Sequence, residues 1–410
     1  MVRNEKRPKN MPRKCGSPDL IQIQQCKKSM RFMRKGGNVI NILFFIESLS
    51  GGGAEKVLRN LVNAMDQTKF CITVQTLYPE NVEKYLALGI RYKHCYPAKN
   101  RINKLRMRAE AAAGLTYPLH IRDDYDIEVA YLESGSTKIM AGSTNRRALK
   151  LAWVHSDLQN WANPDDFAAA TKKYYARYDL AVCVSENVRK SFEKLYGDTV
   201  PAVTVYNTID DGEILRKSAE TLSPDVSKRK LTIAAVGRLS APKHFIRALT
   251  AHKRMLEDGL DHDLWIVGDG EERSLLEAYI QENHLDASAK LLGFRENPYN
   301  LMYAADILVC SSIFEGFSTF VTEGLILGKP IVTTDVSGMH ELLSDSEYGL
   351  ITANDDEAFY EGVKRMLTEP RLLEHYAEQA KIRGRDFKCE KLAKDTEAFF
   401  ERELRKKRGK

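Results

Sequence analysis

The sequence predicts an α/β protein of two domains, each built on a doubly wound parallel sheet, that face one another across a cleft. Its 410 residues exceed what a single hydrophobic core ordinarily supports and fit two domains. Short apolar runs alternate with helical stretches in both halves, which is typical of parallel sheets. A polar segment at 217–230 has the composition of a linker. We therefore expect an N-terminal domain at 38–216, a C-terminal domain at 231–386, and a helix with a basic tail at 387–410.

Residues 1–37 form a strongly basic leader, with 11 Lys or Arg and 2 acidic residues. The whole chain has a net charge of only +6, so the remainder is slightly acidic. The leader lacks the apolar segment of a secretory signal, and no apolar run in the chain approaches the ~20 residues that cross a bilayer. We expect the leader to be disordered. It is either an arm drawn to anionic lipid or nucleic acid, or an artefact of start-site choice, because Met30 and Met33 precede the first strand.

The cysteines indicate the cellular compartment of the protein, and a second basic stretch indicates what its surface could bind. The seven cysteines show no metal-ligand spacing, and those within apolar runs predict buried thiols in a reducing cytoplasm. Arg91–Arg108 holds seven Lys or Arg, no acid, and interleaved apolar and aromatic residues. We interpret it either as a solvated loop and helix or as a surface for an anionic membrane or a charged acceptor. It matches no nucleic-acid-binding module, so we expect no nucleic-acid partner.

A glycine triplet follows the first predicted strand, Asn41–Ile46, and precedes a helical pattern. Gly52 and Gly53 would let the backbone approach a ligand at a helix N-terminus, although a tight structural turn is an equal alternative. The spacing is not GxGxxG, so it lends little support to dinucleotide binding. Further strands of this half are expected at Ile72–Leu77, Ile127–Leu132, Leu149–Val154, Leu180–Val184 and Val203–Tyr206.

Ligands of such sheets bind at the carboxyl ends of the strands, which directs attention to the residues that follow each run. His155 directly follows a predicted strand and is a candidate ligand contact, although a lone histidine is more often structural. In the C-terminal half, Arg238 and Lys243 follow the first strand and could converge on a diphosphate. Phe294 follows another strand and could frame a base. The strands of this half are expected at Leu231–Val236, Leu264–Val267, Lys290–Leu292, Asp306–Cys310, Pro330–Thr334 and Leu350–Thr352.

Two glutamates lie around a predicted strand, turn and helix junction at Phe314–Glu323. Glu315 stands in the turn and Glu323 in the helix, beside backbone N–H groups that lack partners at a helix N-terminus. Ionised carboxylates accept hydrogen bonds from vicinal hydroxyls, so the pair suits a ligand that contains sugars. The alternative is that both glutamates only favour the helix dipole.

With these motifs in order, the chain resembles the retaining glycosyltransferases of glycosyltransferase family 4, which have the GT-B fold. The resemblance extends over about residues 38–386 and implies two Rossmann-like domains. It also implies a nucleotide-sugar donor, with a UDP-sugar favoured, and a glycan or polyprenyl-linked acceptor in cell-envelope polysaccharide synthesis. The motifs that carry it are Gly237-Arg238-Leu239-Ser240 with Lys243, Val267-Gly268-Asp269-Gly270, Leu292-Gly293-Phe294, and Glu315-Gly316-Phe317 with Glu323.

The resemblance implies a role for each residue that matches a motif of the family. Arg238 and Lys243 would bind the donor diphosphate and neutralise charge on the leaving nucleotide. Glu315 would position the donor sugar, and Glu323 would hold the ribose. The remaining donor contacts would be the backbone of Gly316, Phe317 and Ser318, the base-framing Phe294, His155 near the reacting sugar, and Gly52 and Gly53 near donor and acceptor.

The resemblance further implies retention of the anomeric configuration, with no metal or other cofactor in the chemistry. The departing phosphate would assist deprotonation of the acceptor, and Glu315 would position the sugar without acting as nucleophile. Two positions depart from the family pattern: His244 replaces a glycine, and Ser318 stands where many members have proline or another small residue. We expect a cytoplasmic hexosyltransferase, either free or peripheral on the inner face of the plasma membrane.

Three rival functions remain open from the sequence. A sugar-nucleotide epimerase of the same fold should lack the combination of Arg238, Lys243 and the two glutamates. A non-catalytic sugar-nucleotide sensor would keep the binding residues and show no turnover. A Rossmann oxidoreductase is the weakest, because the glycine fingerprint and its following acid are missing.

Overall fold

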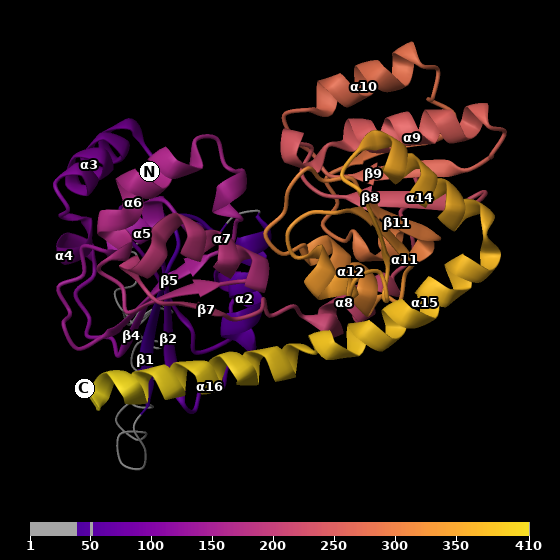
Figure 1. Ribbon diagram of the computed structural model, residues 1–410. Helices are drawn as coiled ribbons and strands as arrows, with labels where there is room; N and C mark the ends of the chain where they lie inside the picture. Colours follow the sequence, from indigo (N-terminus) through magenta and orange to yellow (C-terminus); the bar gives the residue numbers. More distant parts are fainter. Residues whose placement is uncertain (1–38, 50–51, 410) are drawn as a thin grey trace, which may run out of the picture.

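The computed structural model describes residues 39–49 and 52–409, and it forms two α/β domains side by side (Figure 1). The predicted leader at 1–37 lies outside the described residues. All strand pairings within both sheets are parallel, which confirms the predicted architecture. The predicted strands all occur, with ends shifted by at most two residues.

The first sheet has seven strands in the order β3-β2-β1-β4-β5-β6-β7. The chain winds outward from β1 in both directions, so the carboxyl ends of β1 and β4 lie at the point where the winding reverses. The strands are β1 (Ile40–Phe45), β2 (Phe70–Thr76), β3 (Arg91–His94), β4 (Ile127–Ala130), β5 (Leu149–Val154), β6 (Leu180–Cys183) and β7 (Ala202–Thr204).

The edge strand β3 corrects one expectation, because Arg91–His94 was interpreted as the start of a basic loop or surface. An edge strand pairs on one side only, and this one is half exposed, so it needs no apolar pattern. Its Arg91 and Lys93 both pair with Asp123, and Arg106 pairs with Glu110. The seven basic residues of Arg91–Arg108 therefore do not form one continuous surface.

The second sheet has six strands in the order β10-β9-β8-β11-β12-β13 and repeats the same winding. Helices cover both faces of each sheet, as expected for right-handed crossovers between parallel strands (Figure 1). The strands are β8 (Thr232–Val236), β9 (Asp263–Val267), β10 (Ala289–Gly293), β11 (Ile307–Cys310), β12 (Ile331–Thr334) and β13 (Leu350–Thr352).

The helices divide between the two domains in chain order. Those that follow the strands of the first sheet are α2 (Gly53–Ala64), α3 (Arg101–Ala112), α4 (Thr116–His120), α5 (Gly135–Met140), α6 (Pro164–Tyr175) and α7 (Glu186–Tyr196). The later ones are α8 (Asp211–Ser218), α9 (Phe245–Glu257), α10 (Arg273–Glu282), α11 (Tyr299–Ala304), α12 (Thr319–Ile326), α13 (Met339–Leu343), α14 (Asp356–Thr368), α15 (Pro370–Gly384) and α16 (Cys389–Arg408).

Two helices cross between the domains. The helix α8 follows the first sheet but packs against α11 and α12, and the predicted boundary at residue 216 falls inside it. The helix α16 leaves the second domain and runs beneath the first, where it packs on α2 and β5 (Figure 1). Lys407 pairs with Asp179 and Arg408 with Asp126, so two bases of the predicted tail dock the helix on the first domain. No helix among the described residues is both long and apolar enough to cross a membrane.

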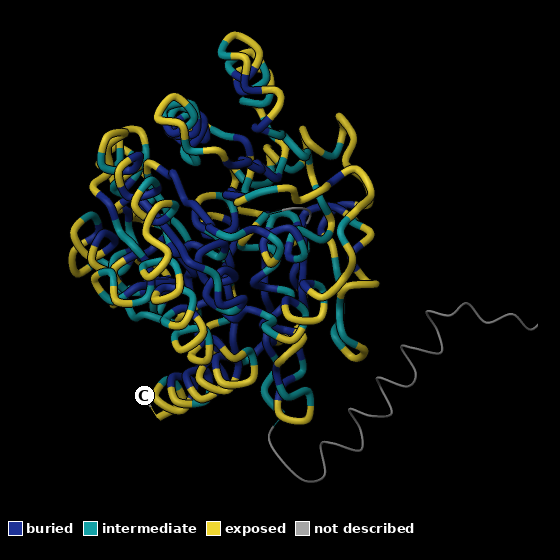
Figure 2. Tube along the Cα trace, turned by 90° about the vertical axis from the view of Figure 1, so that its right-hand side faces the viewer, coloured by how far each residue is buried: buried dark blue, intermediate teal, exposed yellow. Residues whose placement is uncertain are grey.

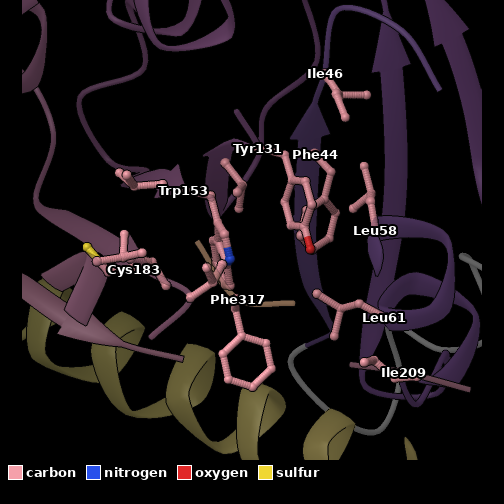
Figure 3. Close-up of a cluster of buried hydrophobic side chains, with 14 of the residues drawn as sticks. Phe44, Ile46, Leu58, Leu61, Tyr131, Trp153, Cys183, Ile209 and Phe317 are labelled. Atoms are coloured by element: carbon pink, nitrogen blue, oxygen red, sulfur yellow. The ribbon is translucent and has the colours of Figure 1, made fainter. Parts of the chain in front are cut away.

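Buried residues gather in the interior of the molecule, and exposed residues lie along its outer helices and loops (Figure 2). A large apolar cluster spans the first sheet, α16 and the facing part of the second domain (Figure 3). It includes Phe44, Trp153 and Phe400 from the first domain side and Phe317 from the second. Because this core is shared, the two domains approach each other closely at the carboxyl ends of their strands.

Candidate functional site

The centre of the site is an ion pair between two predicted residues. Lys243 Nζ lies 2.5 Å from Glu315 Oε1, and Ser312 Oγ donates to the same oxygen at 2.6 Å. Lys243 ends a short 3₁₀ turn after β8, whereas Glu315 lies in the loop after β11, the neighbouring strand. Adjacent parallel strands thus bring together two residues 72 positions apart.

The charge of Lys243 is set by its surroundings. Burial alone would lower the pKa of Lys243, but the nearby carboxylate of Glu315 raises it above its ordinary value. The lysine is therefore a cation at every physiological pH. Glu315 accepts hydrogen bonds from two donors and is 11% exposed in its side chain. Such a carboxylate is an oriented acceptor for hydroxyls.

Arg238 lies on the exposed rim of the same strand end, with 75% of its side chain exposed. Its Nε lies 3.3 Å from Glu271 Oε2, and it does not contact Lys243 directly. The turn that holds it is braced by the Val267-Gly268-Asp269-Gly270 turn, since Leu239 N donates to Asp269 O at 3.0 Å. Gly268 has φ +144°, and a Cβ there would lie 1.8 Å from Gly237 O, so only glycine fits.

The loop after β11 touches the first domain directly. A Cβ on Gly316 would lie 2.0 Å from His155 O, and Ser185 Oγ donates to Gly316 O at 3.3 Å. The absence of a side chain at Gly316 thus allows the backbone beside Glu315 to approach the end of β5. This contact brings the predicted His155 to the predicted sugar-positioning loop.

His155 is held as a neutral imidazole. Its backbone N–H donates to Glu133 Oε2 at 3.0 Å, and its ring lies 4.9 Å from that of Tyr131. Burial lowers the pKa of His155 to about 4, and the charge of Glu133 offsets only part of this effect. Its Nε2 is buried and has no hydrogen-bond partner among the described residues. A ligand group near Glu315 could supply that partner.

Two helix N-termini face each other near this loop. Gly52 is the N-cap of α2, and a Cβ on Gly53 would lie 3.9 Å from Thr319 Oγ1 at the start of α12. Ser318 caps α12 by accepting from Val321 N at 3.4 Å, and it is 1% exposed. The structure thus gives Ser318 a capping role, and its contact with a donor remains a prediction.

The two predicted aromatic contacts lie in different surroundings. Phe294 follows β10 and is 75% exposed. Its ring is therefore accessible for stacking on the base of a ligand. Phe317 is buried, with its ring centroid 5.7 Å from that of Tyr206 in the first domain. The side chain of Phe317 therefore joins the domains, and only its backbone remains a candidate donor contact.

Glu323 has a partner that the sequence interpretation missed. Lys56 Nζ on α2 lies 2.6 Å from Glu323 Oε1, although the two residues belong to different domains. Tyr299 OH donates to the same oxygen at 3.1 Å, and Lys56 also donates to that hydroxyl. A lysine three residues after the glycine triplet was the available signal, but its partner lies 267 residues away.

Further contacts at the interface were also not predicted. Glu341 on α13 accepts from Glu186 N and Asn187 N at the start of α7, each at 2.9 Å. Asp157 accepts from Ser337 Oγ across the same interface. No local pattern marks such residues, because each depends on the other domain.

The backbone conformation of His244 explains why a glycine is usual at this position. It has φ 49° and ψ 48°, the left-handed conformation, between the turn that carries Lys243 and the start of α9. Histidine is among the few side chains that adopt this conformation, at some cost. The departure from the family pattern therefore leaves the shape of the loop intact.

Comparison with known proteins identifies the family and the fold of the chain. The family model for glycosyl transferases group 1 matches residues 220–383, which include all predicted site residues of the second domain. The chain is 18% identical to Anabaena HepE, solved in complex with UDP and glucose, at a TM-score of 0.70. The alignment covers 88% of this chain and 99% of that one, so the two share a fold.

Two curated relatives carry the comparison further. One is the N-acetylgalactosamine-N,N'-diacetylbacillosaminyl-diphospho-undecaprenol 4-alpha-N-acetylgalactosaminyltransferase of Campylobacter jejuni, 35% identical over 86% of this chain and 96% of the relative. Another is the UDP-Gal:alpha-D-GlcNAc-diphosphoundecaprenol alpha-1,3-galactosyltransferase of Escherichia coli, 27% identical over 56% of this chain and 58% of the relative. With its fold, its motifs and a relative matched over nearly its whole length, this chain belongs to the group 1 glycosyltransferases, and it is a GT-B-fold enzyme.

Proposed function

We propose that the protein transfers a sugar from a nucleotide-sugar donor, with a UDP-sugar favoured, to a glycan on a polyprenyl diphosphate, with retention of the anomeric configuration. The Lys243–Glu315 pair, 2.5 Å apart and next to Gly316, whose backbone lies against that of His155, is the observation that carries the proposal. It combines a fixed cation for a leaving phosphate with an oriented acceptor for sugar hydroxyls. The acceptor class is that named for the Campylobacter jejuni and Escherichia coli relatives.

The mechanism follows from where charge develops. The bond between the anomeric carbon and the diphosphate breaks while the acceptor hydroxyl attacks from the same face. The acceptor proton passes to an oxygen of the leaving diphosphate. Lys243, Arg238 and the N-terminus of α12 stabilise that negative charge, so we propose that no metal takes part in the chemistry. Glu315 fixes the sugar, and the neutral His155 donates a hydrogen bond from its buried ring.

A release assay tests the transfer. The protein is incubated with a panel of UDP- and GDP-sugars and a short polyprenyl diphosphate glycan, with and without EDTA. We expect nucleoside diphosphate release from one donor, insensitive to EDTA and lost in Glu315→Gln, while the exposed Glu361→Gln on α14 behaves as wild type. Binding without release under all conditions would favour the sensor. An inverted anomeric configuration, read by NMR of the product, would contradict retention.

We also propose that the protein attaches peripherally to the inner face of the plasma membrane through α3. This helix has no buried residue, and Ile102 and Leu105, one turn apart, are 78% and 70% exposed. Arg101 and Lys104 lie on the adjoining face of the helix, with no ion pair among the described residues. These two exposed apolar residues beside bases without ion pairs are the feature of α3 that supports attachment to anionic lipid.

Vesicle flotation tests the attachment. We expect the protein to float with vesicles rich in anionic lipid and not with neutral ones. Ile102→Ser with Leu105→Ser should abolish flotation, whereas Leu275→Ser, an equally simple change of an exposed leucine on α10, should not. Equal flotation of all variants would contradict a role for α3.

A further inference from the structure

The two residues that follow β11 each contact one member of the Lys243–Glu315 pair. Ser311 Oγ donates to the backbone oxygen of Lys243 at 2.9 Å, and Ser312 Oγ donates to Glu315 Oε1 at 2.6 Å. Each serine is only 1% exposed, so water does not compete for these hydroxyls. Two neighbouring side chains thus reach both charged residues of the site from the interior of the domain.

The backbone of this dipeptide is anchored to the second domain. Ser311 O accepts from Arg247 Nη1 at 3.2 Å, and Ser312 O accepts from Thr334 Oγ1 at 2.6 Å. Arg247 lies on α9 and Thr334 ends β12, and the two residues are 6% and 0% exposed. Because buried donors hold both carbonyl groups, the two serine side chains leave the backbone from fixed positions.

The contact of Ser311 acts on the turn that carries Lys243. That turn, Ala241–Lys243, receives a second hydrogen bond from the same segment, because Ile313 N donates to Pro242 O at 2.8 Å. Both hydrogen bonds end on backbone oxygens and leave the lysine ammonium untouched. Ser311 therefore helps to set where the Lys243 side chain begins, and with it the position of the cation.

The contact of Ser312 acts on the carboxylate of Glu315 itself. The serine hydroxyl and the ammonium of Lys243 both donate to Oε1, at 2.6 Å and 2.5 Å. A hydroxyl that donates to a carboxylate makes a short, charge-assisted hydrogen bond, which limits the rotation of the carboxylate. Without this bond, mainly Lys243 would hold the group, and the direction of its lone pairs would be less well defined. Ser312 therefore helps to orient the acceptor that the sugar would meet.

We propose that Ser311 and Ser312 are positioning residues with separate tasks: Ser311 sets Lys243 for the donor diphosphate, and Ser312 sets Glu315 for the donor sugar. The inference rests on the proposed function, because that function assigns the diphosphate and the sugar to these two residues. A ligand that ends at its diphosphate depends on Ser311 alone, whereas a ligand that also carries the sugar depends on both serines. A merely structural role would not separate the two ligands.

The experiment measures dissociation constants of the full chain by calorimetric titration with UDP, UDP-galactose and UDP-N-acetylgalactosamine. We expect Ser311→Ala to weaken UDP and the UDP-sugar that binds by the same factor, roughly fivefold, because both ligands carry the diphosphate. Ser312→Ala should leave the affinity for UDP within about twofold of the wild type and weaken the UDP-sugar roughly tenfold, since only the sugar meets Glu315.

Controls separate this inference from the loss of fold or of function. Ser218 is also buried, and its hydroxyl donates to Leu215 O on α8, so Ser218→Ala is the matched change and should bind every ligand as the wild type does. If Ser312→Ala weakens UDP as much as the UDP-sugar, or if either site variant binds both ligands as the wild type does, the inference is overturned while nucleotide binding stands. Failure of the folded wild type to bind UDP or either UDP-sugar would instead overturn the proposed function, and the inference with it.

Discussion

Lys243 and Glu315 form an ion pair of 2.5 Å at the carboxyl ends of neighbouring strands, β8 and β11. Neither residue marks a site on its own, and the pair exists only because the sheet places these two strands side by side. The pair joins the group that would stabilise a leaving phosphate to the group that would hold the sugar. Replacement of either residue therefore leaves the charge of the other without its partner.

Replacement of the lysine tests this coupling. Lys243→Met should lower the rate of nucleoside diphosphate release by roughly 10²-fold, the usual cost of one stabilising donor for a developing anion. Because the pKa of Lys243 is raised above 10.5, no alkaline loss of activity below about pH 10 should come from this group. Release rates across pH check both points. The partly exposed Lys253→Met on α9 is the control, and equal rates for the two variants would contradict the assigned role.

Glu341 provides a prediction for the interface. Its carboxylate accepts from two backbone N–H groups at the start of α7, an 11-residue helix in the other domain. Loss of two hydrogen bonds to a charged group should raise the donor KM by roughly tenfold in Glu341→Ala, through weaker domain closure. Small-angle scattering should show a larger radius of gyration. Glu347→Gln, an exposed change nearby, should leave both values unaltered.

His244 tests the cost of a left-handed backbone. A non-glycine residue loses about 1–2 kcal/mol in this conformation, and glycine loses about 0.4–1 kcal/mol through the flexibility of the unfolded chain. We expect His244→Gly to raise stability by about 0.5 kcal/mol, and the β-branched His244→Val to lower it by more than 1 kcal/mol. Urea unfolding midpoints measure both. A lower midpoint for the glycine variant would show that the His244 side chain contributes more than its backbone costs.

The buried pair His252 and His262 predicts acid sensitivity of the second domain. His252 Nδ1 lies 2.8 Å from His262 Nε2, and burial lowers the pKa of His252 from 6.5 to about 3, with the charges of His262 and Lys230 adding to the effect. Between these values the unfolded chain binds the proton and the folded one does not. Stability should therefore fall as the pH drops from about 6.5 toward 3, by up to about 1.4 kcal/mol per pH unit.

Substitution of this histidine provides the measurement. Thermal unfolding midpoints of the wild type and of His252→Gln, compared between pH 7 and pH 4, should converge at the acidic end. His375→Gln on the exposed face of α15 should follow the wild type at each pH. If the unfolding midpoints of the wild type and of His252→Gln fall in parallel as the pH drops, groups other than His252 cause the loss of stability in acid.

The sequence by itself determined the strand order along the chain, the two domains and the residues at strand ends. Apolar runs between turn residues are local signals, and motifs such as Glu315 to Glu323 lie within one short segment, so both are legible without a structure. The edge strand Arg91–His94 was not legible, because a half-exposed edge needs no apolar pattern. The burial of Phe317 was hidden for a different reason, because its ring packs against Tyr206 of the other domain.

Only the tertiary structure decided which residues meet. The partners Lys56 and Glu323 are separated by 267 positions, and the carboxylate of Glu341 caps a helix about 155 residues earlier. Contacts of this kind depend on how the two sheets dock, and docking involves the shared core and α16, which packs on α2 and β5 of the first domain. Periodicity reports which face of an element is buried, but not against which distant element it packs. For that reason the sequence supplied the chemistry of the site, and the fold supplied the partners that orient it.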